Sequence, residues 1–116
     1  MSRRSRRGPR QRRFRRIKLM TDYTAFPLWG IADEGRWGGG MLSPAALPIS
    51  AELVDRLWRW AAVYDQLPEN NFQWPSAEVE AEFHAEGRRL HGLLRDELGP
   101  EYEVWYFDEA TGGVER

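Results

Sequence analysis

Two stretches of this chain carry both a start and a stop signal for a helix, and they constrain the fold more than any other feature. The first begins at Ser50, a good N-cap residue, and must end before Pro68, which cannot continue a helix. The second begins at Ser76 and ends at Gly99-Pro100. A short loop joins the two segments, so we expect an antiparallel pair. The expected helices span about 51–67 and 77–98.

Apolar residues recur along both segments at spacings of three and four, which is typical of a helix with one buried face. In the first segment they are Leu53, Leu57, Trp60, Tyr64 and Leu67. In the second they are Val79, Phe83, Leu90, Leu94 and Leu98, with Gly87 in the gap. Each helix therefore has an apolar stripe that must pack on another part of the molecule.

Two further segments alternate between apolar and polar residues, as strands do. Over residues 16–24, alternation places Ile17, Leu19, Thr21 and Tyr23 on one face. Residues 102–108 are apolar on both faces, with Val104 and Tyr106 opposite Trp105 and Phe107. Such a strand is covered on both sides or lies at a partner interface.

This order of elements predicts an α+β fold, with two central strands and both helices on one face of the sheet. Two strands leave open edges, so a third short strand near 37–42 or a homodimer that continues the sheet would cover them. The 25-residue connection at 25–49 is long and favours a functional role. We expect a basic, disordered arm at 1–15, one domain at 16–108 and a polar tail at 109–116.

The formal net charge of −1 conceals two oppositely charged parts. Ten of the 17 basic residues lie among the first 18 positions, whereas residues 19–116 hold 7 basic and 18 acidic residues, a formal charge of −11. A basic arm therefore precedes an acidic body. The arm residues are Arg3, Arg4, Arg6, Arg7, Arg10, Arg12, Arg13, Arg15, Arg16 and Lys18.

Several interpretations of the arm remain open. It can be a disordered leader, since almost nothing in residues 1–13 could be buried. It can tether nucleic acid, because its cations would neutralise phosphates without reading sequence. Its arginine-rich, acid-poor composition also matches an organellar transit peptide. Finally, it can fold back onto the acidic body.

Most catalytic and metal chemistries lack the residues that they require. The chain has no cysteine, so disulfides, thiolate metal sites and cysteine nucleophiles are excluded. The glycine run at 35–40 lacks the Lys-Ser/Thr pair of a phosphate-binding loop. No apolar run approaches the roughly 20 residues that span a bilayer. We assign no catalytic, cofactor or metal residue, and although an enzyme is not excluded, no group of residues argues for one.

Two other sets of residues are candidates for binding. His84, Arg88 and His91 line one face of the second helix, which is polar and expected to be solvated; with Arg36 they could instead bind a small anion. Aromatic residues in predicted loops either complete the core or form a recognition surface framed by acidic groups. The loop aromatics are Trp29, Trp37, Phe72 and Trp74.

Several short motifs resemble a group of small bacterial proteins of unassigned role, over roughly residues 17–108. The resemblance implies a bacterial, cytoplasmic setting and brings no catalytic residues with it. The motifs are Asp22-Tyr23, Pro27-Leu28-Trp29, Leu47-Pro48-Ile49-Ser50, Trp60, Tyr64-Asp65, Phe83, Glu86-Gly87-Arg88 and Arg95-Asp96-Glu97-Leu98-Gly99.

Small size, an acidic body and spare aromatics favour a cytoplasmic protein-interaction module. One concrete form is an immunity or antitoxin-like protein whose acidic body blocks the basic surface of a toxin. An alternative is a nucleic-acid-associated protein that acts through the arginine-rich arm, and a third is a small-anion binder or an enzyme of unknown class. A membrane partner is not expected.

Overall fold

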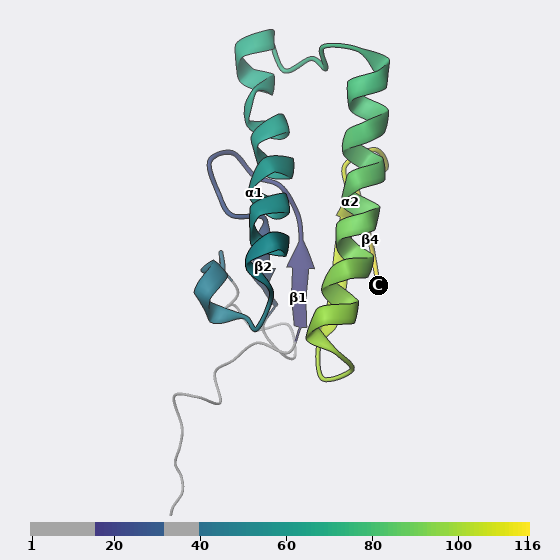
Figure 1. Ribbon diagram of the computed structural model, residues 1–116. Coiled ribbons are helices and arrows are strands. Elements are labelled where there is room, and N and C mark those ends of the chain that lie inside the picture. The colour runs from purple at the N-terminus through teal and green to yellow at the C-terminus, as the bar shows by residue number, and fades with distance from the viewer. Residues whose placement is uncertain (1–15, 32–39) are drawn as a thin grey trace, which may run out of the picture.

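The computed structural model describes residues 16–31 and 40–116. Residues 1–15 of the expected arm, Arg36 and Trp37 lie outside that range, whereas Arg16 and Lys18 lie in the first strand. The fold is α+β, as expected from the sequence: a sheet with two long helices on one of its faces (Figure 1). The strands are β1 (Arg16–Leu19), β2 (Leu28–Gly30), β3 (Glu103–Asp108) and β4 (Gly113–Glu115). The α-helices are α1 (Ala51–Asp65) and α2 (Ala77–Leu98), with short 3₁₀ helices η4 (Pro44–Ala46) and η5 (Leu67–Asn70).

The sheet has the order β2-β1-β3-β4 and is mixed. β1 pairs in parallel with β3, with Ile17 opposite Val104, and antiparallel with β2. β4 pairs antiparallel with β3. The first and last thirds of the chain therefore meet at the centre of the sheet, and both helices belong to the crossover between β1 and β3.

Serine caps begin both α-helices, as the sequence indicates. The side chain of Ser50 accepts a hydrogen bond from the Leu53 amide, and that of Ser76 accepts one from the Val79 amide. α2 ends at Leu98, where Gly99 adopts a φ of +81° that a residue with a side chain rarely takes. α1 ends two residues earlier than expected, because the chain tightens into η5 around Pro68.

The core lies between the sheet and the two helices. Ile17, Leu19, Val104 and Tyr106 point from the sheet toward the helices and are almost completely buried. The apolar stripes that the sequence predicts on the two helices pack against these sheet residues. Tyr64 and Val79, at the edges of the stripes, are only partly buried. The helix residues of the hydrophobic core cluster are Leu53, Leu57, Trp60, Phe83, Leu90, Leu94 and Leu98.

Two strands differ from the sequence prediction. The first strand was expected to reach residue 24 but ends at Leu19, because the chain turns at Asp22–Ala25, where Thr24 has a φ of +62°. The polar tail expected at 109–116 contains β4, which a turn through Gly112 folds back onto β3. Both segments are short and rich in turn residues, so alternation could not define them.

The strand expected near 37–42 is found in part. Met41 forms a β-bridge with Trp29, and hydrogen bonds join residues 40 and 42 to the neighbouring β2 backbone. Its pairing partner β2 was not expected, since Pro27 and Gly30 leave room for only three strand residues. Among the described helices, none is long and apolar enough to cross a membrane.

Candidate functional site

A groove runs between α1 and α2 on the side of the helices that faces away from the sheet. It has a volume of about 470 Å³ and an apolar floor between two charged rims. We call it the interhelical groove. Its lining residues are Arg56, Arg59, Trp60 and Val63 from α1, and Glu78, Val79, Glu82, Phe83 and Glu86 from α2.

Two stacked rings form the floor of the groove. The rings of Trp60 and Phe83 lie 4.8 Å apart and 11° from parallel, and the Trp60 indole donates a hydrogen bond to the Phe83 carbonyl oxygen (2.8 Å). Gly87 makes this close approach feasible. A Cβ atom at Gly87 would lie 2.8 Å from Trp60 Cζ2 and 2.7 Å from the Tyr106 hydroxyl. The missing side chain therefore sets the distance between α2, the groove floor and the sheet.

Three glutamates, Glu78, Glu82 and Glu86, follow one another at spacings of four residues along the α2 rim. Glu86 accepts hydrogen bonds from Arg56 across the groove (2.8–3.0 Å) and from Arg89 (2.6 Å), and Glu82 pairs with Arg89 (3.1 Å). Arg89 donates the hydrogen bonds to Glu82 and Glu86, and they raise its pKa; the bond to Glu82 has the larger effect and the bond to Glu86 the smaller one. An ion network thus closes one end of the groove, whereas Glu78 at the other end has no ion-pair partner within 16–31 and 40–116.

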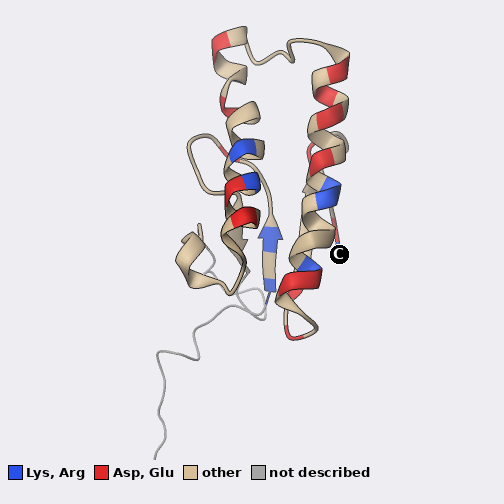
Figure 2. Ribbon diagram, viewed as in Figure 1, with Lys and Arg blue, Asp and Glu red and all other residues tan. Residues whose placement is uncertain are grey.

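Acidic residues concentrate at the end of the helix pair next to η5. Residues 60–87 contain six acids and neither lysine nor arginine. Figure 2 shows this concentration as red along the upper half of α2 and at the upper end of α1 and η5. We call this region the acidic tip. Its acids are Asp65, Glu69, Glu78, Glu80, Glu82 and Glu86.

Phe72 projects from the loop between η5 and α2, and 66% of its surface is exposed. Asn71 and Phe72 both have φ near +60°, and the Phe72 amide donates to the Leu67 carbonyl oxygen (2.7 Å). A bulky residue adopts this backbone region only at a cost of about 1 kcal/mol or more. Tyr23 lies edge-on to Phe72 at 6.2 Å and stacks on Tyr64 at 4.8 Å. The loop therefore holds an aromatic ring outward beside the acidic tip.

The other described loop aromatics, Trp29 and Trp74, are partly buried. The Trp29 indole donates to the Met20 carbonyl oxygen (2.9 Å), and its ring is partly exposed. Trp74 packs on Phe83 at 5.0 Å and against His84 at 6.0 Å. Of the described candidates, only Phe72 is mostly exposed.

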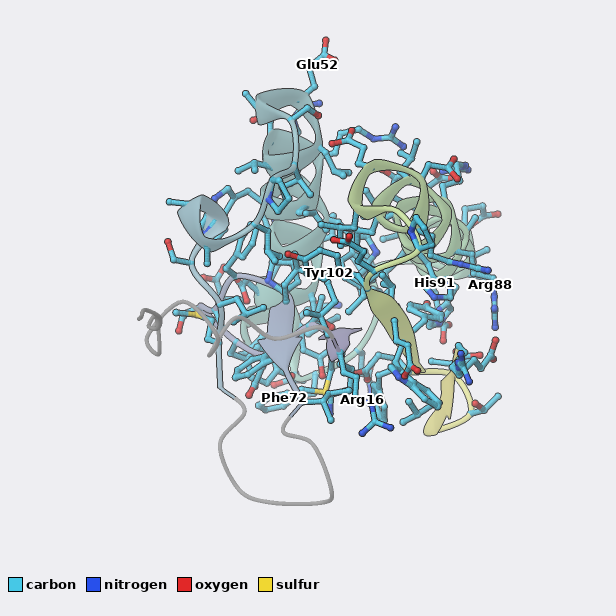
Figure 3. All side chains as sticks on the ribbon, turned by 90° about the horizontal axis from the view of Figure 1, so that it is seen from below. Arg16, Glu52, Phe72, Arg88, His91 and Tyr102 are labelled. Carbon is cyan, nitrogen blue, oxygen red and sulfur yellow. The ribbon has the colours of Figure 1, made fainter. Side chains whose placement is uncertain are left out.

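The residues considered for anion binding have other partners. Arg88 pairs with Asp108 (2.8 Å) and Glu115 (3.0 Å), and the hydrogen bond to Glu115 raises the pKa of Arg88. His91 is buried rather than solvated: its Nε2 lies 2.7 Å from the Val104 carbonyl oxygen. His84 lies beside Glu80, with Nε2 to Oε2 at 3.8 Å. Arg88 and His91 (Figure 3) thus have separate partners, and His84 has only the longer contact with Glu80.

A small polar cluster lies where β3 ends. The Tyr64 hydroxyl donates to Glu109 Oε1 (3.5 Å), and burial together with Tyr23 raises the pKa of Tyr64. Burial also raises the pKa of Glu109, against the opposing effect of the Tyr64 hydrogen bond. Across the part of the chain that the structure describes, no group of three or more His, Asp or Glu side chains could hold a metal ion.

Sequence reasoning missed the interhelical groove. The signal was present in the spacing of Glu78, Glu82 and Glu86 beside Val79 and Phe83. Reading it required knowing which flank of α2 faces α1, and the side-chain pattern of a single helix does not define that.

The comparisons with known proteins point to one family. A family model described as Serratia CdiI immunity protein-like matches residues 15–109. No curated protein matches the chain significantly. The matched range agrees with the span of the bacterial resemblance seen in the sequence and leaves out most of the arginine-rich arm.

Proposed function

We propose that this chain, which belongs to the Serratia CdiI immunity protein-like family, binds a toxin protein through the interhelical groove and the acidic tip and so protects the cell that makes it. The observation that carries the proposal is an apolar, ring-floored groove bordered by an excess of acid, in a member of an immunity protein-like family. The bacterial cytoplasm is the setting in which we propose that it acts.

The groove floor supplies the apolar part of such an interface. Trp60 and Phe83 are held rigidly by stacking and by the indole hydrogen bond, so an incoming side chain orders little of the surface when it binds. A pre-formed pocket at the centre of a polar rim is the usual location of the residues that dominate binding energy. One inserted aliphatic or aromatic partner side chain fits this chemistry.

The acidic tip supplies charge complementarity. Glu78 extends from the open end of the groove, and Glu69 and Asp65 lie on the neighbouring elements. A cluster of like charge attracts a basic partner, speeds association and repels acidic proteins. We therefore propose that the toxin presents lysine or arginine side chains to this region.

Phe72 provides a separate contact outside the groove, in the loop between η5 and α2. An outward aromatic ring next to acidic groups is typical of protein interfaces, where aromatics are enriched and contribute strongly to affinity. Its backbone has a φ of +60°, a strained conformation for a bulky residue, and such strain often occurs at binding sites.

A co-culture experiment tests the proposal even while the toxin is unidentified. The gene is deleted from its host, and the mutant is grown in contact with its parent strain. We expect the parent to outcompete the mutant and a plasmid copy of the gene to restore its survival. Equal growth of parent and mutant in contact would contradict an immunity function.

Charge reversal then locates the surface. We expect Glu78→Lys combined with Glu82→Lys to lower survival in co-culture by about tenfold or more, since like charges facing a basic partner cost several kcal/mol. Glu101→Lys is the matched control, because Glu101 is exposed in the turn between α2 and β3. If both proteins restore survival equally, the toxin binds elsewhere.

Filling the groove provides an independent test. Val63 lines the groove, whereas the preceding residue, Ala62, is exposed on α1 and does not. We expect Val63→Arg to abolish protection and Ala62→Arg to preserve it, with equal thermal stability checked by circular dichroism. The reverse result would place the interface on the opposite flank of α1.

A further inference from the structure

The face of the sheet that points away from the helices has a chemistry of its own. Burial alternates along β1 and β3, so every second residue of these strands is partly exposed on the side opposite the core. We call this side the open sheet face. Figure 3 shows Arg16 on that side, below the sheet. The residues of β1, β2 and β3 on this face are Arg16, Lys18, Trp29, Glu103, Trp105 and Phe107.

The register of the sheet places two tryptophans on either side of a lysine. Lys18 is opposite Trp29 on β2 and opposite Trp105 on β3. Neighbouring strands are about 4.8 Å apart, so the backbones of the two tryptophans lie roughly 10 Å from each other across the row. Phe107 follows Trp105 on the same face, about 6.6 Å along the strand. Three aromatic rings thus share one surface.

Cations accompany these rings, although the body as a whole is acidic. Arg16 and Arg116 share one carboxylate, that of Glu103, at 3.3 and 3.7 Å. The Arg116 guanidinium also lies 5.5 Å from the centre of the Trp105 ring. Among the described residues, Lys18 has no ion-pair partner. The side chains at this surface therefore carry a net positive charge, opposite to that of the acidic tip.

We propose that the open sheet face binds single-stranded nucleic acid. Bases would stack on Trp29, Trp105 and Phe107, and phosphates would pair with Lys18, Arg16 and Arg116. A sheet covered by helices on one side, with aromatic rings and cations on the other, provides a stacking platform for unpaired bases. A duplex is not the ligand, because its bases are already stacked on one another and cannot reach the rings.

Charge separates this ligand from the alternatives. A second copy of this chain would bring together two faces of like charge, and a basic protein of the kind proposed for the groove would be repelled. The polyanionic backbone of a nucleic acid complements Lys18 and the two arginines. Eight further arginines lie in residues 1–15, directly before Arg16 in the sequence, and their charge has the same sign.

Fluorescence anisotropy with the full chain tests the proposal. The probes are fluorescein-labelled 12-nucleotide oligo(dT) and oligo(U), at about 50 mM salt, where phosphate contacts are strong. We expect Trp105→Ala to weaken binding about tenfold or more, because it removes one stacked base. Lys18→Ala should weaken binding and reduce the salt slope, by about 0.7 if it meets one phosphate. Trp105→Phe, which keeps a ring, should retain most of the affinity.

Trp58→Ala is the matched control, since Trp58 is an exposed tryptophan on α1, away from the open sheet face. We expect it to bind like the unaltered protein. Absence of binding by the full chain would overturn the proposal. Equal affinity for Trp105→Ala, Lys18→Ala and the unaltered protein would overturn it too, because the arm alone would then account for binding.

The co-culture assay distinguishes this proposal from the toxin-binding one. We expect Trp105→Ala to lose oligonucleotide affinity and keep protection, and the double lysine variant of Glu78 and Glu82 to show the opposite. If Trp105→Ala and Lys18→Ala lose protection while oligonucleotide affinity is unchanged, the open sheet face binds protein and the proposal is wrong. If Trp105→Ala changes the sedimentation of the protein but not its oligonucleotide affinity, the face serves self-association, and the proposal is again wrong.

Discussion

The interhelical groove and the open sheet face lie on opposite sides of one small domain, and they differ in almost every property relevant to binding. The groove is concave, has an excess of acidic side chains and has two almost completely buried rings as its floor, whereas the sheet face carries partly exposed rings in a row with basic side chains among them. Both surfaces arise because, along each helix and strand, residues that face the core alternate with residues that face solvent. A helix exposes a flank every three to four residues, whereas a strand exposes every second residue, so the two surfaces can evolve separately.

Gly87 connects the two surfaces and should give the largest effect on stability. A methyl group there would press on both Trp60 and Tyr106. We expect Gly87→Ala to lower the free energy of unfolding by about 1–3 kcal/mol, with part of that loss offset by better helix propensity. Because both surfaces depend on this contact, protection and oligonucleotide binding should weaken together. Denaturant unfolding measures the change.

Gly92 is the matched control for that substitution. It lies on the same helix, and a Cβ atom there would have no heavy atom within 4 Å. We expect Gly92→Ala to raise the free energy of unfolding by about 0.5–1 kcal/mol. If both alanines stabilise the protein, the contact of Gly87 with Trp60 and Tyr106 does not limit packing.

Substitution of Ser76 should weaken the interhelical groove without affecting the open sheet face. Its side chain caps α2, and the residues that follow include Glu78 and Val79 of the groove. We expect Ser76→Ala to cost about 1 kcal/mol and to speed hydrogen exchange at the start of α2. Protection should decline while oligonucleotide binding stays constant. A parallel loss of both would show that the two surfaces are coupled.

The smallest expected effect is on the pH dependence of stability. Burial raises the pKa of Glu109 above its ordinary value of 4.5, so the folded protein holds that proton more tightly than the unfolded chain. Glu109 therefore lowers stability as pH rises through the window between the unfolded and folded pKa values. We expect Glu109→Gln to remove this decrease, as measured by thermal unfolding from about pH 4 to 7.

Glu115 should respond in the opposite direction. Its hydrogen bond from Arg88 lowers its pKa below 4.5, so its contribution to stability is present above the unfolded pKa and is lost as pH falls through the folded one. Glu115→Gln should therefore flatten the acid limb of the stability curve. If both glutamine variants shifted the same limb, the assignments of these two carboxylates would be wrong.

The helices could be predicted from sequence because their signals are local. The caps at Ser50 and Ser76 and the stop at Gly99 are each defined by a few adjacent residues. The sheet could be predicted only in outline. β2 and β4 have three residues each, too few for alternation to distinguish them from turns. Strand order depends on contacts between distant segments, which no local pattern encodes.

The binding surfaces could be predicted less well than the fold. The sequence showed that Phe72 and Trp74 lie in the same loop, but it could not show that only Phe72 is mostly exposed. His91 looked like part of a solvated face, yet it is buried against Val104 at the edge of that face. For the open sheet face, the sequence predicts only that β3 is apolar on both sides. Which residues lie beside β3 on that face depends on the pairing of the neighbouring strands.

The parallel pairing of β1 with β3 also determines when the molecule can assemble during synthesis. β1 leaves the ribosome before both helices, and β3 leaves it after them. Until β3 emerges, β1 has only a three-residue partner, and a two-stranded hairpin is marginal on its own. A nascent chain can form its helices before β3 emerges, but the centre of the sheet closes only afterwards. Closing so large a loop late makes folding slower than that of a helical hairpin of equal size.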